Sequence, residues 1–563
     1  MASRKLLREL WQPVSKVWRG EATSTITRRA IQSSAKQAHP PFPGKEQIRR
    51  PPKRRFQTAA YAGGGALAIL LGTQLSRPEV WKEKDAPAPV SIPETKTKHF
   101  RIAEVKQHDS TSGRPWVTRG TSVYDITEWV GAHPGGDVIL RAAGGSIDPY
   151  WDIFTIHKRQ DVYDILESFR IGEIDPADLV EGKLPSQAID NPFATDPVRD
   201  ERLITLTACP RNAETPAEVL SDFLTPNGLF YVRNHMWVPV VDEPKHNLTI
   251  ELPSGEEKSY TLADLKTRFP IHKISATLQC SGNRRADMSK HVPEKKTNGL
   301  QWKSGAISNA EWEGVRLRDV LADAGLDVCN PGEGARHAQF SGVEAYGASI
   351  PMAKALDPSG DVLLAFKMNG QALPRDHGYP LRVVVPGSVA ARSVKWLSRI
   401  VISDEESTSQ WQRRDYKSFG PNVGDKPDWS TAPSIQEMPV TSAITRVARG
   451  DRGEGPLRVE GYAYSGGGRE IVRVDVSMDG GESWGQARLV DDEARGSRAW
   501  CWKRWRYEGT PGGEGKAEVV VKATDESYNT QPEGYGGIWN ARGNLSCAWH
   551  RVDVGSGEGG KAA

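Results

Sequence analysis

Cys280 ends an apolar run in "LQCSGNRR", and Arg284 and Arg285 follow it closely. A cysteine in this setting can pack inertly in the core, act as a nucleophile with a base such as His272 or His377, form a disulfide, or bind a metal as a thiolate. The chain has only 5 cysteines, widely spaced and without a CxxC pair, so a disulfide framework and a zinc ribbon are both disfavoured. Residue types alone leave the other three roles open.

Arginine, lysine and histidine recur in four short segments of the central part of the chain. The segments are "YVRNH" (231–235), "LQCSGNRR" (278–285), "RDHGYPLRVVVPG" (375–387) and "RSVKWL" through "WQRRDYK" (392–417). Guanidinium groups match the geometry of phosphate and other oxyanions, so this density of basic side chains predicts a site for a polyanion. Positive charge also favours a thiolate and lowers the pKa of a nearby cysteine.

Two histidines nearer the N-terminus lie 24 residues apart in apolar surroundings. His133 belongs to the "HPGG" turn after an expected strand at 123–126, and His157 precedes helical apolar spacing at 162–169. Two imidazoles on one heme iron leave no open coordination position, so such a site carries electrons without activating oxygen. Residues 99–175 resemble the cytochrome b5 family, which implies a b-type heme (heme b) with His133 and His157 as the iron ligands.

The heme segment is acidic, with 12 Asp/Glu against 8 Lys/Arg in residues 99–175. Long-range charge steers the weak, quickly dissolving contacts that electron carriers need. An acidic face therefore predicts a basic redox partner.

Long motifs follow one another in the central and C-terminal parts of the chain. They are "LQCSGNRR", "YGASIP", "MNGQALPRDHGYPLRVVVPG" and "SIQEMPVTSAIT". With them, residues 99–552 resemble the molybdopterin-dependent sulfite oxidase family. The resemblance implies that the Cys280 thiolate binds molybdenum together with two sulfurs of molybdopterin. It also implies that sulfite is oxidised to sulfate, and that electrons leave one at a time through the heme to cytochrome c.

The same resemblance implies roles for the basic segments. Arginines neutralise a dianionic substrate, a tyrosine hydroxyl donates to it, and a lysine holds phosphate. The implied catalytic and substrate residues are Cys280, Tyr416, Arg233, Arg285, Arg542, Trp302 and Asp415. The implied cofactor contacts are His235, Cys280, His377, Arg382 and Lys395. The stretch between Arg285 and Trp302 is longer than the usual spacing of the family, and the resemblance assigns no role to Arg284.

The N-terminal region has the composition of a targeting sequence. Residues 1–58 hold 14 Lys/Arg but only 3 Asp/Glu, which is typical of a mitochondrial presequence. A nucleic-acid-binding arm is the rival interpretation, but the apolar, Gly- and Ala-rich stretch 58–76 that follows argues against it. We expect residues 1–80 to direct the protein to the mitochondrial intermembrane space, with a single N-terminal membrane anchor as the alternative.

At 563 residues, 37% of them hydrophobic, the chain can form several domains with separate cores. We expect a multidomain α+β protein, with a helix at 315–326 and strands at 381–387 and 398–403 in its central part. The expected parts are a presequence and apolar segment (1–80), a cytochrome b5-like heme domain (96–175), a hinge linker (176–195), an α+β molybdenum cofactor domain (196–432), an immunoglobulin-like dimerisation domain (433–555) and a disordered tail (556–563).

Turn signals recur about every ten residues beyond residue 435. In "EIVRVDVSMDGGESW", strict alternation places Val472, Val474 and Val476 on one face, and "DGG" is a hairpin turn. Several such strands without helices predict an immunoglobulin-like β-sandwich. The family resemblance implies that this domain forms a homodimer.

Two other functions compete with a sulfite oxidase. A eukaryotic nitrate reductase resembles the central and C-terminal parts but places its heme after molybdenum, whereas here the heme segment comes first. A non-catalytic heme electron carrier would use only residues 99–175 and would leave the central basic segments without a purpose. An absorption spectrum with metal analysis separates these functions.

Overall fold

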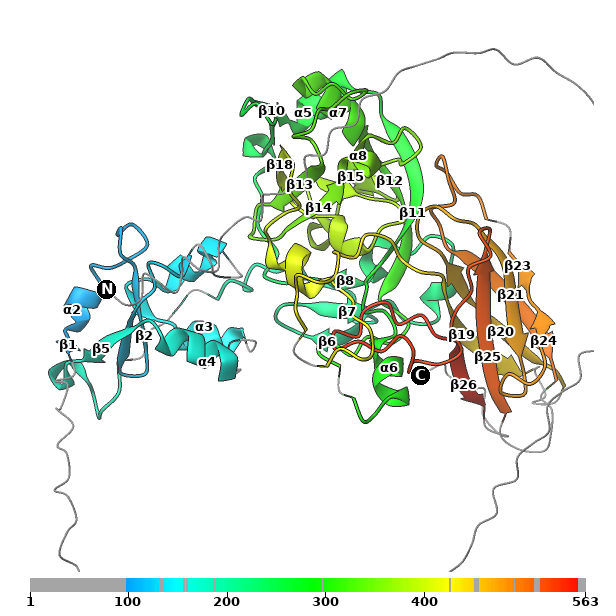
Figure 1. The fold of residues 1–563 in the computed structure, drawn as a ribbon, viewed down its shortest axis with the longest axis horizontal. Coiled ribbons are helices and arrows are strands. Elements are labelled where there is room, and N and C mark those ends of the chain that lie inside the picture. Colours follow the sequence, from blue (N-terminus) through cyan, green and yellow to red (C-terminus); the bar gives the residue numbers. More distant parts are fainter. Residues whose placement is uncertain are drawn as a thin grey trace, which may run out of the picture. The chain divides into compact units, whose positions relative to one another are not determined.

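The computed structural model describes residues 98–554, apart from 131–132, 134–135, 155–156, 158–159, 186–188, 190, 296, 425–426, 450–454, 491 and 511–516. The expected presequence and anchor (1–80) and the expected tail (556–563) lie outside the described residues. No helix within the described part of the chain is long and apolar enough to cross a membrane. Figure 1 shows several folded parts along a multidomain α+β chain.

The heme segment folds as one five-stranded sheet, in the order β1-β5-β3-β2-β4, with helices (Figure 1). Its strands are β1 (His99–Phe100), β2 (Trp116–Arg119), β3 (Ser122–Asp125), β4 (Gly145–Ser146) and β5 (Arg170–Ile174). Its helices are α2 (Ile102–Val105), a 3₁₀ helix (Gly136–Ala142), α3 (Asp148–Ile153) and α4 (Gln160–Glu167). The strand expected at 123–126 and the helical spacing at 162–169 are therefore present as β3 and α4, and Val117, Tyr124 and Leu166 pack in one core.

The central domain contains three sheets, in the orders β10-β9-β18-β13-β14, β11-β12-β15-β16 with β17 on β15, and β6-β7-β8. Its strands are β6 (Ile204–Thr207), β7 (Asn212–Glu214), β8 (Val232–Arg233), β9 (Asn247–Glu251), β10 (Glu257–Thr261), β11 (His272–Gln279), β12 (Ile307–Arg316), β13 (His337–Gly342), β14 (Gly347–Pro351), β15 (Leu363–Met368), β16 (Gln371–Ala372), β17 (Arg382–Val384) and β18 (Leu397–Ser403). Its α-helices are α5 (Leu262–Arg268), α6 (Arg285–His291), α7 (Leu317–Ala324) and α8 (Met352–Leu356).

Helix α7 is the amphipathic helix expected at 315–326. Its apolar stripe is fully buried at Val320 and Leu321, and it ends where Gly325 adopts a φ of +110°, a conformation that glycine reaches without steric strain. The two residues before Leu317 continue β12 instead, because Val315 pairs with Leu364 of β15. The expected strands at 381–387 and 398–403 are β17 and β18.

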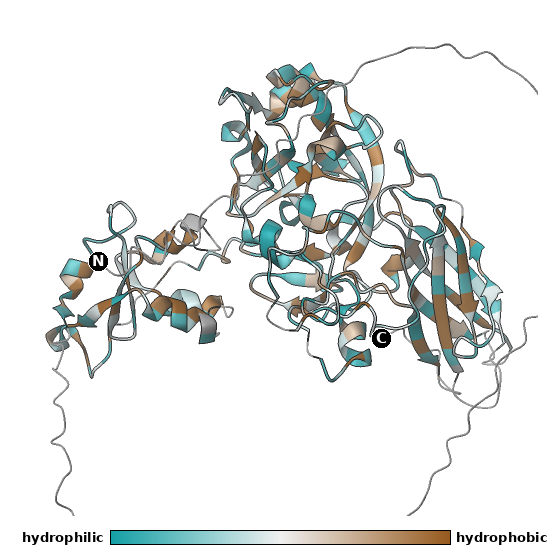
Figure 2. Cartoon of the chain, viewed as in Figure 1, coloured by the Kyte–Doolittle hydropathy of each residue, from teal (hydrophilic) through white to brown (hydrophobic). Residues whose placement is uncertain are grey.

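The C-terminal domain is a β-sandwich of two four-stranded sheets, β19-β20-β24-β23 and β22-β21-β25-β26. Its strands are β19 (Thr441–Arg449), β20 (Leu457–Tyr464), β21 (Ile471–Ser477), β22 (Gly485–Gln486), β23 (Arg488–Leu489), β24 (Lys503–Gly509), β25 (Ala517–Asp525) and β26 (His550–Val554). Hydrophobic and hydrophilic residues alternate along these strands (Figure 2). The inner faces meet in one apolar core that includes Val459, Val476 and Trp505, as an immunoglobulin-like sandwich requires.

The alternation expected along β21 is interrupted at its first residues. A register shift between Ile471 and Arg473 marks a β-bulge, and a bulge moves the following side chains to the opposite face. Ile471 is therefore buried while Val472 is 44% exposed, whereas Val474 and Val476 are buried as expected. Sequence periodicity could not reveal the extra residue.

Strand β11 joins the central domain to the sandwich and ends at Gln279, immediately before Cys280. One edge of β11 pairs with β12 in an antiparallel register. On the other edge, the backbone N–H of Thr277 donates to the Trp500 carbonyl at 3.0 Å, and that of Ser275 donates to the Arg495 carbonyl at 2.9 Å. The cysteine at the end of this strand is thus held at the boundary of two domains.

Gly461 of β20 tests the packing inside the sandwich. A Cβ at this position would overlap the Ala443 carbonyl oxygen and lie 2.5 Å from the Trp505 ring. Because backbone cannot move aside easily, we expect Gly461→Ala to lower the free energy of unfolding by about 3 kcal/mol. Thermal and urea unfolding measure this loss. Gly534→Ala, where a Cβ meets open space, is the matched control, and equal stabilities of the two variants would contradict the packing described here.

Candidate active site

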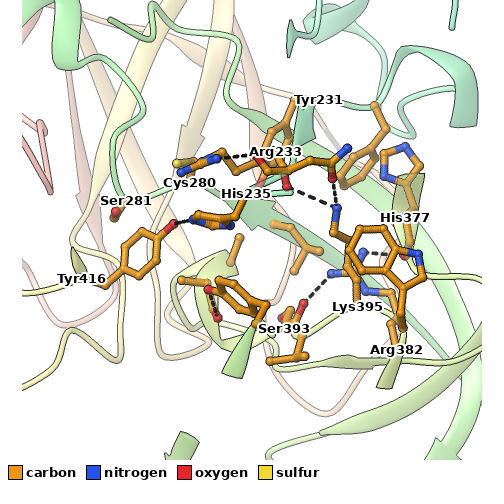
Figure 3. Close-up of a pocket in the computed structure, with 18 of the residues that line it drawn as sticks. Tyr231, Arg233, His235, Cys280, Ser281, His377, Arg382, Ser393, Lys395 and Tyr416 are labelled. Carbon is orange, nitrogen blue, oxygen red and sulfur yellow. Dashed lines mark hydrogen bonds between the residues drawn. The ribbon is translucent and has the colours of Figure 1, made fainter. Parts of the chain in front are cut away.

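A pocket with an empty volume of about 680 Å³, its open mouth included, lies beside the end of β11. Seven of the residues predicted from the sequence line it: Arg233, His235, Cys280, His377, Arg382, Lys395 and Tyr416. Figure 3 shows that Cys280, Ser281 and Tyr416 gather at one end, while His377, Arg382 and Lys395 gather at the other. The four basic segments therefore meet at a single site.

Cys280 is held rigidly at the first end of the pocket. Its side chain is buried, and its backbone N–H donates to the Ala306 carbonyl at 2.9 Å. Arg233 ends β8 and lines the same pocket, where its guanidinium donates to the Asn234 carbonyl at 2.6 Å and to Asn212 Oδ1 at 3.1 Å. A cysteine sulfur and a guanidinium therefore line the same pocket.

Tyr416 and His235 share a hydrogen bond of 3.0 Å between the tyrosine hydroxyl and Nε2. Burial, with the positive charges of Arg233 and Lys395, holds the pKa of His235 well below its usual range, so the imidazole is neutral at pH 7. Burial raises the pKa of Tyr416 although Arg233 opposes this. The pair is therefore uncharged, and the tyrosine hydroxyl keeps its proton.

The opposite end of the pocket holds buried cations on backbone carbonyl oxygens. Lys395 Nζ donates to the Asp376 carbonyl at 2.8 Å and to the Arg233 carbonyl at 3.2 Å. Arg382 donates to the carbonyls of His377 and Ser393 at 3.0 and 2.9 Å. Burial lowers the pKa of both Lys395 and Arg382. Carbonyl dipoles orient these cations without neutralising them, so this end of the pocket favours an anion.

Glu344 also lines the pocket, and sequence reasoning did not identify it. Burial raises the pKa of this carboxyl to about 8, and its Oε2 atom has no hydrogen-bond partner among the described residues. A buried acceptor without a partner is unfavourable unless a ligand supplies a donor. In the sequence, Glu344 is an acidic residue two positions before the "YGASIP" motif, and this position was the only sign of its role.

The pocket residues fit an elongated cofactor with different chemistry at its two ends. Cys280 offers a sulfur ligand for a metal at one end. Lys395 and Arg382 offer positive charge for a phosphate at the other end, and Glu344 offers an acceptor for ring N–H groups. These are the groups that a molybdenum–pterin cofactor presents.

Four of the predicted site residues lie outside the lining of the pocket. Arg285 is directed into the wall, where it donates to the carbonyls of Arg542 and Leu300 at 2.8 and 2.7 Å. Trp302 is 1% exposed and packs in the same apolar cluster as Cys280. Arg542 forms an ion pair of 3.0 Å with Asp415. A motif shows that residues are close in the sequence, but it does not show which side chains line the pocket and which pack behind the lining.

Arg284 joins the loop after β11 to the C-terminal sandwich. Its guanidinium donates to the carbonyls of Ser442 and Ala548 at 3.0 and 2.8 Å and to the Tyr535 hydroxyl at 2.7 Å. Its Nε pairs with Asp287 at 3.0 Å. The side chain is 1% exposed, and the sequence left its role open. In the structure, this buried side chain links the central domain to the C-terminal domain by hydrogen bonds.

Glu214, at the end of β7, supports the loop that carries Trp302. It is 2% exposed and accepts a short hydrogen bond from the backbone N–H of Lys303. Burial raises the pKa of this carboxyl to about 7. The loop is therefore tied to a titratable group that is neutral over much of the acidic range.

The two histidines of the heme segment face each other as ligands of one iron would. The rings of His133 and His157 are nearly parallel, 9° apart, with their centres separated by 6.2 Å. Metal–imidazole bonds are about 2 Å long, so one metal ion between two such rings needs centres roughly 6 Å apart. Phe154 O lies 3.1 Å from His157 Nδ1, which leaves Nε2 of His157 to bind a metal. The pair fits a heme iron.

Three family models match the chain. A cytochrome b5-like heme/steroid binding domain matches residues 101–175, an oxidoreductase molybdopterin binding domain matches residues 235–411, and a Mo-co oxidoreductase dimerisation domain matches residues 432–556.

Curated relatives and a solved structure agree with these models. Sulfite oxidase of Gallus gallus is 50% identical over 80% of this chain and 98% of its own length. The mitochondrial sulfite oxidase of Homo sapiens is 47% identical over 80% of this chain and 83% of its own. The crystal structure of a sulfane dehydrogenase from Paracoccus pantotrophus matches with a TM-score of 0.53 and 27% identity, over 68% of this chain and 97% of its own.

Substitution of Arg284 tests how much its hydrogen bonds between the two domains stabilise the fold. Arg284→Gln removes the cation from Asp287 and the guanidinium donor from the Ser442 and Ala548 carbonyls, so we expect the free energy of unfolding to fall by about 3–5 kcal/mol. Urea unfolding measures the change. Arg458→Gln breaks a pair with Glu508 that is 63% and 59% exposed, and this control should cost less than about 1 kcal/mol. Losses of equal size would contradict the role of Arg284.

Substitution of Glu214 tests the buried carboxyl through the pH dependence of stability. The folded protein keeps this proton up to about pH 7, whereas an unperturbed glutamate releases it near pH 4.5. The unfolded state thus binds fewer protons in this window, and stability contributed by this group falls as the pH rises from about 4.5 to 7.

Glu214→Gln removes that dependence. Relative to wild type, its free energy of unfolding should rise by about 3 kcal/mol between those two pH values, as urea unfolding at a series of pH values would show. The exposed control Glu508→Gln should give a profile parallel to wild type. A parallel profile for Glu214→Gln would contradict the assignment.

Proposed function

Because this chain belongs to the sulfite oxidase family, we propose that it delivers electrons from sulfite to cytochrome c in the mitochondrial intermembrane space, with sulfite oxidised in the pocket beside Cys280. The protein is a mitochondrial molybdenum–pterin and heme enzyme that oxidises sulfite to sulfate, and its C-terminal domain forms a homodimer. One observation carries the proposed site. Side chains from four distant segments line one pocket around a single buried cysteine.

The residues of the pocket divide into holders of the cofactor and holders of the substrate. When bound, the molybdenum cofactor supplies oxygen transfer and takes up two electrons from sulfite. Cys280 would hold the metal through its sulfur, Lys395 and Arg382 would hold the phosphate, and Glu344 would accept from the N–H groups of the pterin. His377 lines the same end, where burial keeps its imidazole neutral by lowering its pKa to about 3.

Arg233 and Tyr416 are the substrate-binding groups in this proposal. Both line the pocket at the end that holds Cys280. The Arg233 guanidinium offsets part of the negative charge of sulfite and orients its oxygens. The Tyr416 hydroxyl, still protonated because its pKa is raised, donates to a substrate oxygen without adding a further positive charge. Sulfate can therefore leave.

Four further residues act from the wall of the pocket. Arg285 and the ion pair between Arg542 and Asp415 fix the segments around the loop after β11. The positive charge of Arg542 also contributes to the low pKa of His235. We propose that Arg285, Trp302, Asp415 and Arg542 position the substrate-binding groups and raise the positive potential of the pocket.

In this proposal, electrons leave the protein through the heme bound by the heme segment. His133 and His157 would bind the iron from both sides, which leaves no position for substrate. The segment is acidic, and its charge would steer a basic acceptor such as cytochrome c into a transient contact.

Reduction of cytochrome c by sulfite tests the proposed path in the full-length protein. We expect Cys280→Ser to contain little molybdenum and to lose at least about 1,000-fold in turnover, because the metal lacks its protein ligand. We expect His133→Ala to keep its molybdenum, lose its heme absorption and fail to reduce cytochrome c. Cys329→Ser, at an exposed cysteine, is the matched control. Full turnover in Cys280→Ser, or wild-type protein without molybdenum, would refute the proposal.

A further inference from the structure

A buried ion pair lies where the expected linker enters the central domain. The Arg199 guanidinium binds both carboxylate oxygens of Asp376, with Nε–Oδ2 at 2.8 Å and Nη2–Oδ1 at 2.9 Å. Both side chains are only 8% exposed. The two residues are 177 positions apart in the sequence, so the pair ties the start of the domain to the segment that carries His377.

Asp196 anchors the same arginine to the end of the expected linker. One of its oxygens accepts from Arg199 Nη2 at 2.8 Å, and the other accepts from the Val238 backbone N–H at 2.9 Å. Its side chain is 9% exposed. Two carboxylates thus hold one arginine in place.

Asp376 continues the network towards the pocket. Its Oδ1 accepts from Asn234 Nδ2 at 2.9 Å, and its backbone carbonyl accepts from Lys395 Nζ at 2.8 Å. The side-chain oxygen of Asn234 accepts from the same lysine in a short hydrogen bond. Asn234, His377 and Lys395 line the pocket, whereas Asp376 lies behind it. Figure 3 shows His377 and Lys395 at the same end.

The charge of Asp376 depends on Arg199. Burial alone would raise the pKa of this carboxyl, but the hydrogen bonds and charge of Arg199 lower it. Without the arginine, a carboxylate would be left buried with one amide donor and a lysine whose own donors are engaged on other oxygens. Such an uncompensated charge draws neighbouring cations towards itself or takes up a proton. Either response would displace Lys395 or the turn Arg375–His377.

We propose that Arg199 is a positioning residue for the cofactor pocket, and that it sets the place of Lys395 and His377 through Asp376 and Asn234. The inference rests on the proposed function, because it takes these residues to hold the pterin and its phosphate. Arg199 itself does not line the pocket. One consequence concerns the linker that follows the heme domain. It leads directly into Asp196 and Arg199, which hold Asp376 behind the pocket, so the same residues fix the end of the linker and the shape of the pocket.

The test compares full-length variants loaded with cofactor. Arg199→Gln leaves the Asp376 carboxylate without its cation. Arg199→Lys keeps the positive charge but cannot bind both carboxylate oxygens as the guanidinium does. The double variant Arg199→Gln/Asp376→Asn removes both charges. Arg202→Gln is the matched control, since this arginine, three residues away, pairs with Asp200 in an exposed setting, with side-chain exposures of 67% and 27%. The readouts are the rate of molybdenum loss during dialysis, kcat and KM for sulfite, and the melting temperature of cofactor-free protein.

We expect Arg199→Gln to lose molybdenum about 10- to 100-fold faster than wild type, and Arg202→Gln to behave as wild type. The double variant should lie closer to wild type than Arg199→Gln does, because no unpaired carboxylate remains. Arg199→Lys should be intermediate. A lowered melting temperature with an unchanged rate of molybdenum loss would assign Arg199 a merely structural role and overturn the proposal.

Other outcomes are equally decisive. If the double variant loses molybdenum as fast as Arg199→Gln or faster, coupling through Asp376 is refuted. If Arg199→Gln does not fold, Arg199→Lys and the double variant decide the question by the same order of rates. Wild-type protein that contains no molybdenum would refute the proposed function, whereas molybdenum retained equally by wild type and Arg199→Gln would refute this inference alone.

Discussion

Positive charge that is buried but not neutralised is the constraint on which the rest of this structure depends. Arg382 and Lys395 are oriented by backbone carbonyls at the pocket. Carbonyl oxygens satisfy the donors but leave the net charge for an anion to balance. The fold must supply many rigid acceptors at fixed places, and this requirement explains why the site lies where loops from several strands converge.

Every residue that lines the pocket belongs to the central domain, but the C-terminal sandwich supports the site from behind. Cys280 directly follows a strand of the central domain, yet the loop behind it is held by groups of the C-terminal sandwich. Ser281 donates to Asn544 Oδ1 at 2.9 Å, and Arg284 donates to the Ser442 carbonyl. A domain whose family match is to a dimerisation module thus also holds in place the loop that follows Cys280.

Its two redox centres use different coordination chemistry. The heme segment offers two histidine rings that are nearly parallel, 6.2 Å apart, and in the proposed function both would bind the heme iron, so that it would only pass electrons. The central pocket offers one cysteine together with polar groups that leave space for a substrate. Neutral His235 and protonated Tyr416 line the pocket together with Arg233, so in the proposed function the substrate would meet one full positive charge and one uncharged donor at this end of the pocket.

The sequence by itself determined the chemistry and the class of fold. The motifs around Cys280, His133 and His157 were enough to predict a metal ligand and a pair of heme ligands, and regular alternation was enough to predict a sandwich. The bulge at Ile471 and the exposure of Val472 could not be predicted, because one extra residue in a strand leaves no mark in the pattern. Tertiary structure alone decided that Arg285 is directed into the wall, that Glu344 enters the pocket and that Arg199 meets Asp376. Contacts between residues more than a hundred positions apart depend on how the sheets pack, and spacing along the chain carries no record of that packing.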